Sequence, residues 1–106
     1  MNIDDIKQAG GFASEQGEKR PIEWNGHKGE VFVRQISFGR IVATQAMPEA
    51  ERNITLVREC IRLGDSGGEQ MTREQVESLA PALAAAFMAE IAKVNALGAD
   101  ADNPLD

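Results

Sequence analysis

Hydrophobic and polar positions alternate between Pro21 and Ile36, as is typical of β-strands. Two β-prone runs, 21–24 and 30–36, flank the segment 25–29, which begins with Asn-Gly. Asn-Gly between such runs is the strongest short-range signal for a hairpin. Because side chains alternate across a strand, one face is expected to be polar apart from Phe32. The other face is apolar and carries Ile22, Trp24, Val31 and Val33. Since a two-stranded ribbon is marginal in water, this face is expected to pack on helices.

Two helical patterns follow the hairpin. Ser37 is the expected N-cap of the first, which ends near Met47-Pro48 because the residue before a proline avoids the helical region. The side of this helix expected to pack carries Phe38, Ile41, Val42 and Gln45. The second helix is expected over about 49–63, with Gly64 as its stop and 64–70 as a flexible loop. Its apolar stripe consists of Ala50, Ile54, Val57, Cys60 and Ile61.

The run from Thr72 to Leu97 is the clearest helical pattern in the chain. Thr72 and Gln75 form a predicted capping box, and Gly98 is the expected stop. Pro81 has no N–H to donate to the carbonyl of Glu77, so a kink or a break into two helices is expected there. The core-facing stripe has the 3.6-residue period and consists of Val76, Leu79, Ala80, Leu83, Phe87, Ile91, Val94 and Leu97.

These elements predict one α+β domain that is mostly α-helical, with an N-terminal β-hairpin packed on three helices. A chain of 106 residues with 42% hydrophobic positions suits a single small domain. We expect residues 1–19 to be a flexible N-terminal segment with a short helix over 2–9 and a mobile link over 10–19. The domain then spans 20–98, and 99–106 is an acidic tail expected to be disordered. One cysteine indicates a reducing compartment, and no signal peptide or membrane span is expected.

Charge is unevenly distributed along the chain. The net charge is −6, which disfavours binding to nucleic acid in the absence of a concentrated basic face. Residues 34–64 carry five arginines against three glutamates, a net of +2, and residues 65–106 carry two bases against eight acids, a net of −6. Two interpretations remain open: copies of the chain attract each other head to tail, or the opposite charges pair within one chain.

Candidate chemistry is sparse. Residues 64–68 match the G-x-S-x-G nucleophile motif around Ser66. Such an elbow needs a preceding strand and a positioned base, whereas Ser66 is expected to follow a helix and the only histidine, His27, falls in the expected hairpin turn. A small serine hydrolase is therefore the remotest alternative. His27 has no companion ligands for a metal, and the acidic residues lack EF-hand spacing, so neither metal nor cofactor is expected.

Small residues gather on a second side of the last helix. Ala82, Ala85, Ala89 and Ala92, with Met88 at the edge, lie roughly opposite the apolar stripe. Either these alanines are simply good helix formers whose exposure costs little, or a partner helix or a second copy of the chain packs there. We treat these five residues as the candidate partner-binding face.

Glu90 falls within the apolar stripe of the same helix. An unpaired carboxylate there would be costly. We therefore expect the side chain to reach the rim of the core or to pair with an arginine, or else to mark a face used by a partner.

The order of these features resembles a known family. It begins with Gly10-Gly11-Phe12 and the Trp24 hairpin, and continues with Ser37-Phe38, two helices, a glycine-rich loop and the helical stretches Met71–Leu79 and Ile91–Gly98. Over roughly residues 10–98, this order resembles the tail assembly chaperones of long-tailed bacteriophages and prophages. We can match neither the Gly64–Gly68 loop nor Pro81 to a feature of the family pattern. The resemblance therefore implies nothing about how the last two helices pair.

The resemblance implies a non-enzymatic protein in the bacterial host cytoplasm that coats the tape measure protein and keeps it soluble. Tail tube subunits would then displace it, and in many such families a longer frameshifted product recruits the tube. Many weakly bound copies along one long partner would act by multivalency. A homo-oligomer is also compatible with the sequence. The alternatives are a head–tail adaptor or another structural protein of the phage, or a small regulatory protein-binding module.

Overall fold

The computed structural model describes residues 1–14 and 16–97, so the predicted acidic tail lies outside the described residues. The predicted class, a mostly helical α+β fold with an N-terminal hairpin, is confirmed. Its three-stranded antiparallel sheet has the order β1-β2-β3. The elements are α1 (Ile3–Gln8), β1 (Glu18–Trp24), β2 (His27–Val33), α2 (Phe38–Gln45), α3 (Glu49–Cys60), β3 (Ile61–Arg62), α4 (Arg73–Glu77) and α5 (Pro81–Asn95).

The hairpin forms where the sequence predicts it, but its turn is tighter. Asn25 and Gly26 have φ values of 50° and 78°, which is the left-handed pair that a two-residue hairpin turn requires. β2 therefore begins at His27, so this histidine lies on a strand and the expected turn over 25–29 was too long. At the other end, β1 begins at Glu18, inside the segment expected to be a mobile link. The register nevertheless places the predicted apolar residues on one face.

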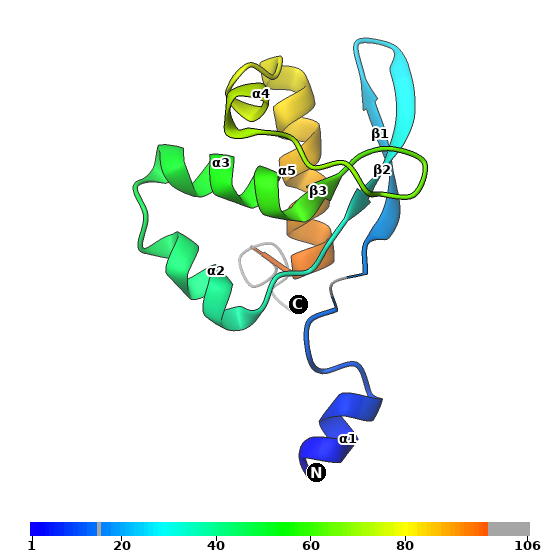
Figure 1. The fold of residues 1–106 in the computed structure, drawn as a ribbon, viewed down its shortest axis with the longest axis vertical. Helices are drawn as coiled ribbons and strands as arrows, with labels where there is room; N and C mark the ends of the chain where they lie inside the picture. Colours follow the sequence, from blue (N-terminus) through cyan, green and yellow to red (C-terminus); the bar gives the residue numbers. More distant parts are fainter. Residues whose placement is uncertain (15, 98–106) are drawn as a thin grey trace, which may run out of the picture.

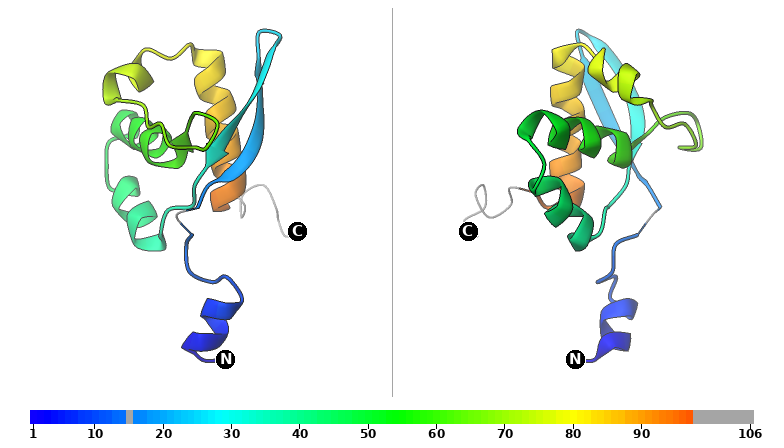
Figure 2. Two further views of the ribbon diagram at one scale, coloured as in Figure 1. Left: turned by 45° about the vertical axis from the view of Figure 1, so that its right-hand side comes forward. Right: turned by 60° about the vertical axis from the view of Figure 1, so that its left-hand side comes forward.

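That apolar face packs on α5, which runs alongside the hairpin (Figures 1 and 2). α3 packs on the other side against α5, and both α2 and α4 pack on α3. The stripe predicted on α5 is confirmed at its centre, because Phe87 is 3% exposed and Ile91 is fully buried. Ala80, which was expected in the stripe, is exposed. The buried core consists of Ile22, Val31, Val33, Val57, Cys60, Ile61, Met71, Val76, Phe87 and Ile91.

The last two helices are separated at Pro81, as expected. The predicted capping box at Thr72 is present, with Gln75 N donating to the Thr72 hydroxyl and Thr72 N donating to the Gln75 side chain. α4 ends at Glu77, and Pro81 occupies the first turn of α5, where its missing N–H costs nothing. A single long helix is thus replaced by two: α4 packs on α3, and α5 packs on both α3 and the hairpin.

A third strand replaces the end of the helix expected over about 49–63. α3 ends at Cys60, and Ile61 has an extended backbone with φ −93° and ψ 129°. Ile61 and Arg62 pair with Val33 and Phe32, so they satisfy backbone groups that β2 would otherwise expose at its edge. Ile61 is fully buried in this position. On α3 itself, Leu56 is buried, whereas Ala50, which the sequence placed in the stripe, is exposed.

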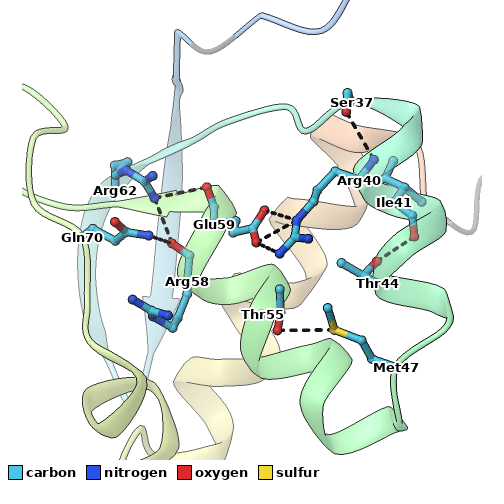
Figure 3. Close-up of polar contacts among 10 residues, drawn as sticks. All are labelled: Ser37, Arg40, Ile41, Thr44, Met47, Thr55, Arg58, Glu59, Arg62 and Gln70. Atoms are coloured by element: carbon cyan, nitrogen blue, oxygen red, sulfur yellow. Dashed lines mark hydrogen bonds and ion pairs between the residues drawn. The ribbon is translucent and has the colours of Figure 1, made fainter.

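The packed side of α2 is not the predicted one. Ser37 caps the helix as expected, but Phe38 is 81% exposed and Val42 is 48% exposed. The buried residue is Thr44, whose hydroxyl donates to the carbonyl oxygen of Ile41 at 2.7 Å (Figure 3). An ion pair between Arg40 and Glu59 also joins α2 to α3. The tertiary contacts of α2 thus turn much of its apolar stripe toward solvent.

The Gly64–Gly68 loop covers an apolar residue on the outer face of the hairpin. A bridge between Leu63 and Glu69 closes the loop. Gly67 lies so close to Phe32 that a Cβ placed on it would be 2.9 Å from the ring, and a Cβ on Gly17 would be 2.9 Å from the Cβ of Phe32. Phe32, the apolar exception on the polar face, is therefore enclosed between two glycines.

The short helix predicted over 2–9 forms as α1 and stands apart from the body of the protein (Figures 1 and 2). Asn2 and Asp5 form a capping box at its start. Ile3 is 66% exposed, and no residue of α1 is buried. The chain reaches the body near Ser14, whose backbone N–H donates to the side chain of Gln35 at 3.1 Å.

Candidate functional site

The structure does not bring Ser66 and His27 together. Ser66 lies beside Phe32, near the end of β2, whereas His27 begins that strand and stacks near Trp24 with 5.2 Å between ring centroids. Five residues of extended strand span about 16 Å. The residues just before the loop form β3 and not the expected helix. A nucleophile elbow requires the chain to enter a helix after the serine, whereas here the chain pairs back on itself through the Leu63–Glu69 bridge.

The groups that most often bind metals are also dispersed. Among residues 1–14 and 16–97, no three His, Cys, Asp or Glu side chains are grouped closely enough to hold a metal ion. Cys60 is fully buried, and its burial raises the pKa of the thiol to about 11, which disfavours the reactive thiolate. In the part of the chain that the structure describes, no helix has the length and apolarity needed to cross a membrane.

Glu90 is paired with an arginine, one of the outcomes expected from the sequence. Its side chain accepts a hydrogen bond from Arg20 Nε at 2.7 Å and another from Lys93 Nζ at 3.3 Å. Burial acts to raise the pKa of Glu90, but these two hydrogen bonds outweigh it and the pKa lies below its ordinary value. The pair thus joins β1 to α5 across the edge of the core.

Glu90→Gln is expected to reduce the acid sensitivity of folding. Because the pKa of Glu90 is lower in the folded chain, its charge stabilises the fold above its unfolded pKa of about 4.3, and this stability is lost as the pH falls through the folded value. Urea titrations from pH 7 to pH 3 should show the gap in unfolding free energy between wild type and variant narrowing below about pH 4. Glu30→Gln is the control, since Glu30 is exposed and 3.8 Å from Lys19. A gap that stays constant down to pH 3 would contradict the role of the pair.

Within the described residues, no ion pair joins a base of residues 34–64 to an acid of residues 65–106. Arg40 pairs with Glu59 inside the basic region, and Arg73 pairs with Glu51 between the two regions. Within the described residues, four arginines of the basic region have no carboxylate at ion-pair distance: Arg34, Arg52, Arg58 and Arg62. The interpretation that partners supply some of the opposite charge therefore stays open.

Exposed apolar residues gather beside α2. Phe12 is 55% exposed and Phe38 is 81% exposed, and both line a groove of about 240 Å³ between the N-terminal segment, the start of α2 and the end of α5. Ile41 lines the same groove, and Val42 lies one helical turn from Phe38. We call these four residues the α2 surface. Sequence reasoning found the apolar side of α2 but assigned it to the core, and only the packing shows that it is open.

The alanine face predicted on α5 is also accessible. Ala82, Ala85 and Ala89 are exposed, whereas Met88 and Ala92 are half-buried and Met88 packs against the core. Ala89 also borders a groove that α5 forms with the hairpin beside Glu23 and Lys28. The face is therefore available to a partner, although its small side chains offer less apolar area than the α2 surface.

A third apolar feature is a cavity of about 270 Å³ between the hairpin and the start of α5. Trp24, Leu79 and Leu83 line it together with the buried ring of Phe87. Trp24 belongs to the hairpin face that the sequence predicted, and Leu79, Leu83 and Phe87 belong to the predicted stripe.

Comparison with known protein families identifies a match. The model of a family described as phage tail assembly chaperone, TAC, matches residues 4–95. No curated protein and no solved structure matches the chain. The family match begins within α1 and continues to the end of α5, and thus includes the α2 surface, the alanine face and the Gly64–Gly68 loop.

Proposed function

The chain belongs to the phage tail assembly chaperone family, and from this premise we propose that it binds the tape measure protein and keeps it soluble while the tail assembles. It does so by protein–protein contact, without catalysis, in the cytoplasm of the bacterial host. Tail tube protein displaces it as the tube grows. A small acidic protein suits this role, because its net charge of −6 keeps a coated complex dispersed.

The observation that carries this proposal is the exposure of the α2 surface. Folding leaves two phenylalanines more than half exposed at one groove, although each would favour burial by roughly 1.5–3 kcal/mol. Exposed aromatic residues next to a groove are the features that bind apolar side chains of a partner. The tape measure protein is therefore held by apolar segments that lie against Phe12, Phe38 and Val42.

The alanine face of α5 is the second candidate surface. Ala82, Ala85 and Ala89 allow a close approach of another helix, either from the tape measure protein or from a second copy of the chain. Substitutions can distinguish the two surfaces, because a charge placed on one surface should not disturb binding of a partner at the other.

Phe38→Asp is expected to abolish the solubilising activity while preserving the fold. Phe38 is the first residue of α2, where an acidic side chain is favourable, and its side chain is exposed. The chain and its tape measure protein are co-expressed, and the soluble fraction of the tape measure protein is measured. Wild type should keep most of the tape measure protein soluble. With Phe38→Asp, the soluble fraction should fall to the level found without chaperone.

Ala43→Asp is the matched control, since Ala43 is exposed on the same helix but outside the α2 surface. It should behave as wild type. If Phe38→Asp keeps its solubilising activity and Ala85→Glu loses it, the binding site is the alanine face and not the α2 surface. Precipitation of the tape measure protein in the presence of abundant folded wild type would contradict the proposed function itself.

A further inference from the structure

A polar cavity of about 240 Å³ lies on the outer face of the sheet, away from α5. It forms where the Gly64–Gly68 loop meets the end of β2. Arg34 and Phe32 are two residues apart and so project on the same side of the chain, and Arg62 comes from the adjacent β3. The lining is completed by Gly17, Ser66 and Gly67. We call this the Arg34–Arg62 pocket.

The two arginines of this pocket have no negative partner among residues 1–14 and 16–97. Arg20, Arg40 and Arg73 each pair with a glutamate, but within the described residues no carboxylate lies at ion-pair distance from Arg34 or Arg62. The Nε of Arg34 is buried and has no hydrogen-bond partner in the part of the chain that the structure describes. Such a donor is destabilising unless something accepts its hydrogen bond. Two neighbouring positive charges and a buried free donor favour an anionic ligand.

The fold holds Arg62 in position for such a ligand. One of its terminal nitrogens donates to the carbonyl oxygens of Arg58 at 2.9 Å and Glu59 at 3.1 Å, at the end of α3 (Figure 3). Its remaining N–H groups are not used in these bonds. Burial lowers the pKa of Arg62, and the positive charge of Arg34 lowers it further. An anion between the two guanidinium groups would relieve this repulsion.

The chemistry of the pocket suits the carboxylate of an acidic side chain. A guanidinium group matches a carboxylate through two parallel N–H donors. Phe32 forms part of the lining, but the exposed surface of the pocket is mostly polar, so charge and hydrogen bonding dominate what it can bind. Two arginines on a chain of net charge −6 do not make the extended basic face that a nucleic acid needs.

We propose that the Arg34–Arg62 pocket binds an acidic side chain of a partner polypeptide. The ligand is an Asp or Glu residue on an exposed segment of that partner, held by the guanidinium of Arg34 and the preset guanidinium of Arg62. This site is separate from the α2 surface, and it does not depend on the identity of the tape measure protein as partner.

The test uses the full chain and a capped peptide of alternating Glu and Gly residues, with a Gln-for-Glu peptide as the neutral comparison. Calorimetry measures affinity, and the Nε–H resonances of the arginines report the contact. Arg34→Gln is expected to weaken binding of the acidic peptide about tenfold or more, and Arg34→Lys to restore it only in part because lysine lacks the planar fork. Circular dichroism checks that each variant is folded.

Arg52→Gln is the matched control. Arg52 also has a buried Nε without a partner, but it lies on α3 outside the pocket, so binding should change less than about twofold. Equal losses in Arg34→Gln and Arg52→Gln, or equal binding of the two peptides, would overturn the proposal. So would binding that occurs only after Asp100, Asp102 and Asp106 are changed to Asn, because the chain would then supply its own ligand. No tape measure protein is present, so failure here is distinct from failure of the proposed function.

Discussion

Phe87→Ala is expected to lower the free energy of unfolding by about 3–5 kcal/mol, the largest effect we predict for a single substitution. Phe87 is 3% exposed and lies where α5 meets the hairpin. Truncation removes its transfer free energy and leaves a void beside the existing cavity of about 270 Å³, which the ring now borders. A domain of this size has only about 5–15 kcal/mol of total stability, so the variant should be close to unfolding at 37 °C.

Phe38→Ala is the matched control for this experiment, because it makes the same chemical change at a side chain that is 81% exposed. Its unfolding free energy should stay within about 0.5 kcal/mol of wild type. Urea unfolding followed by the fluorescence of the single tryptophan, Trp24, measures both variants. A loss below about 1 kcal/mol for Phe87→Ala would show that α5 does not pack on the hairpin as described. Equal losses in the two variants would contradict the exposure of α2.

Gly67→Ala is expected to cost about 2–5 kcal/mol, for two independent reasons. Gly67 has φ +74°, a left-handed conformation that costs a residue with a Cβ roughly 1–2 kcal/mol. The new Cβ would also lie 2.9 Å from the ring of Phe32, and relieving such a contact costs about 1–3 kcal/mol. The variant should unfold at lower urea concentration than wild type, and the loop should be cleaved faster by protease.

Gly26→Ala separates the cost of the backbone conformation from the cost of the steric contact. Gly26 has φ +78°, almost the same conformation, but a Cβ there meets no atom within 4 Å. This control should therefore cost only the backbone part, about 1–2 kcal/mol. Equal losses in the two variants would mean that the loop moves away from Phe32 at no cost, and that it does not serve as a cover for the ring.

The parts of the fold that could be predicted from the sequence are those governed by neighbouring residues. Asn25-Gly26 specified the hairpin because few residue pairs accept two positive φ values in succession. Thr72 and Pro81 placed the start of α4 and the break before α5, because a cap and a missing N–H act within one turn of helix. Phe87 and Ile91 followed from a helical period that is long enough to be unambiguous.

The candidate sites divide in the same way. The alanine face of α5 was visible in the sequence, because small residues at helical spacing form a face whatever packs nearby, and whether a partner uses it stays a prediction. The pairing of Glu90 could be narrowed to a few outcomes, but its partner Arg20 lies 70 positions away along the chain. No local pattern indicates which of several arginines will reach a carboxylate at that separation.

The sequence by itself determined the class of the fold, the hairpin, the helix N-caps at Ser37 and Thr72 and most of the core, because each depends on backbone preferences and periodicity within a few residues. Only the tertiary structure decided that Ile61 joins the sheet, that Phe38 faces solvent and that Arg34 lies beside Arg62. Each of these outcomes depends on which element packs against a given side of a helix or strand, and the packing element comes from a distant part of the sequence. The surfaces proposed for partners are those that no other element of the described chain covers.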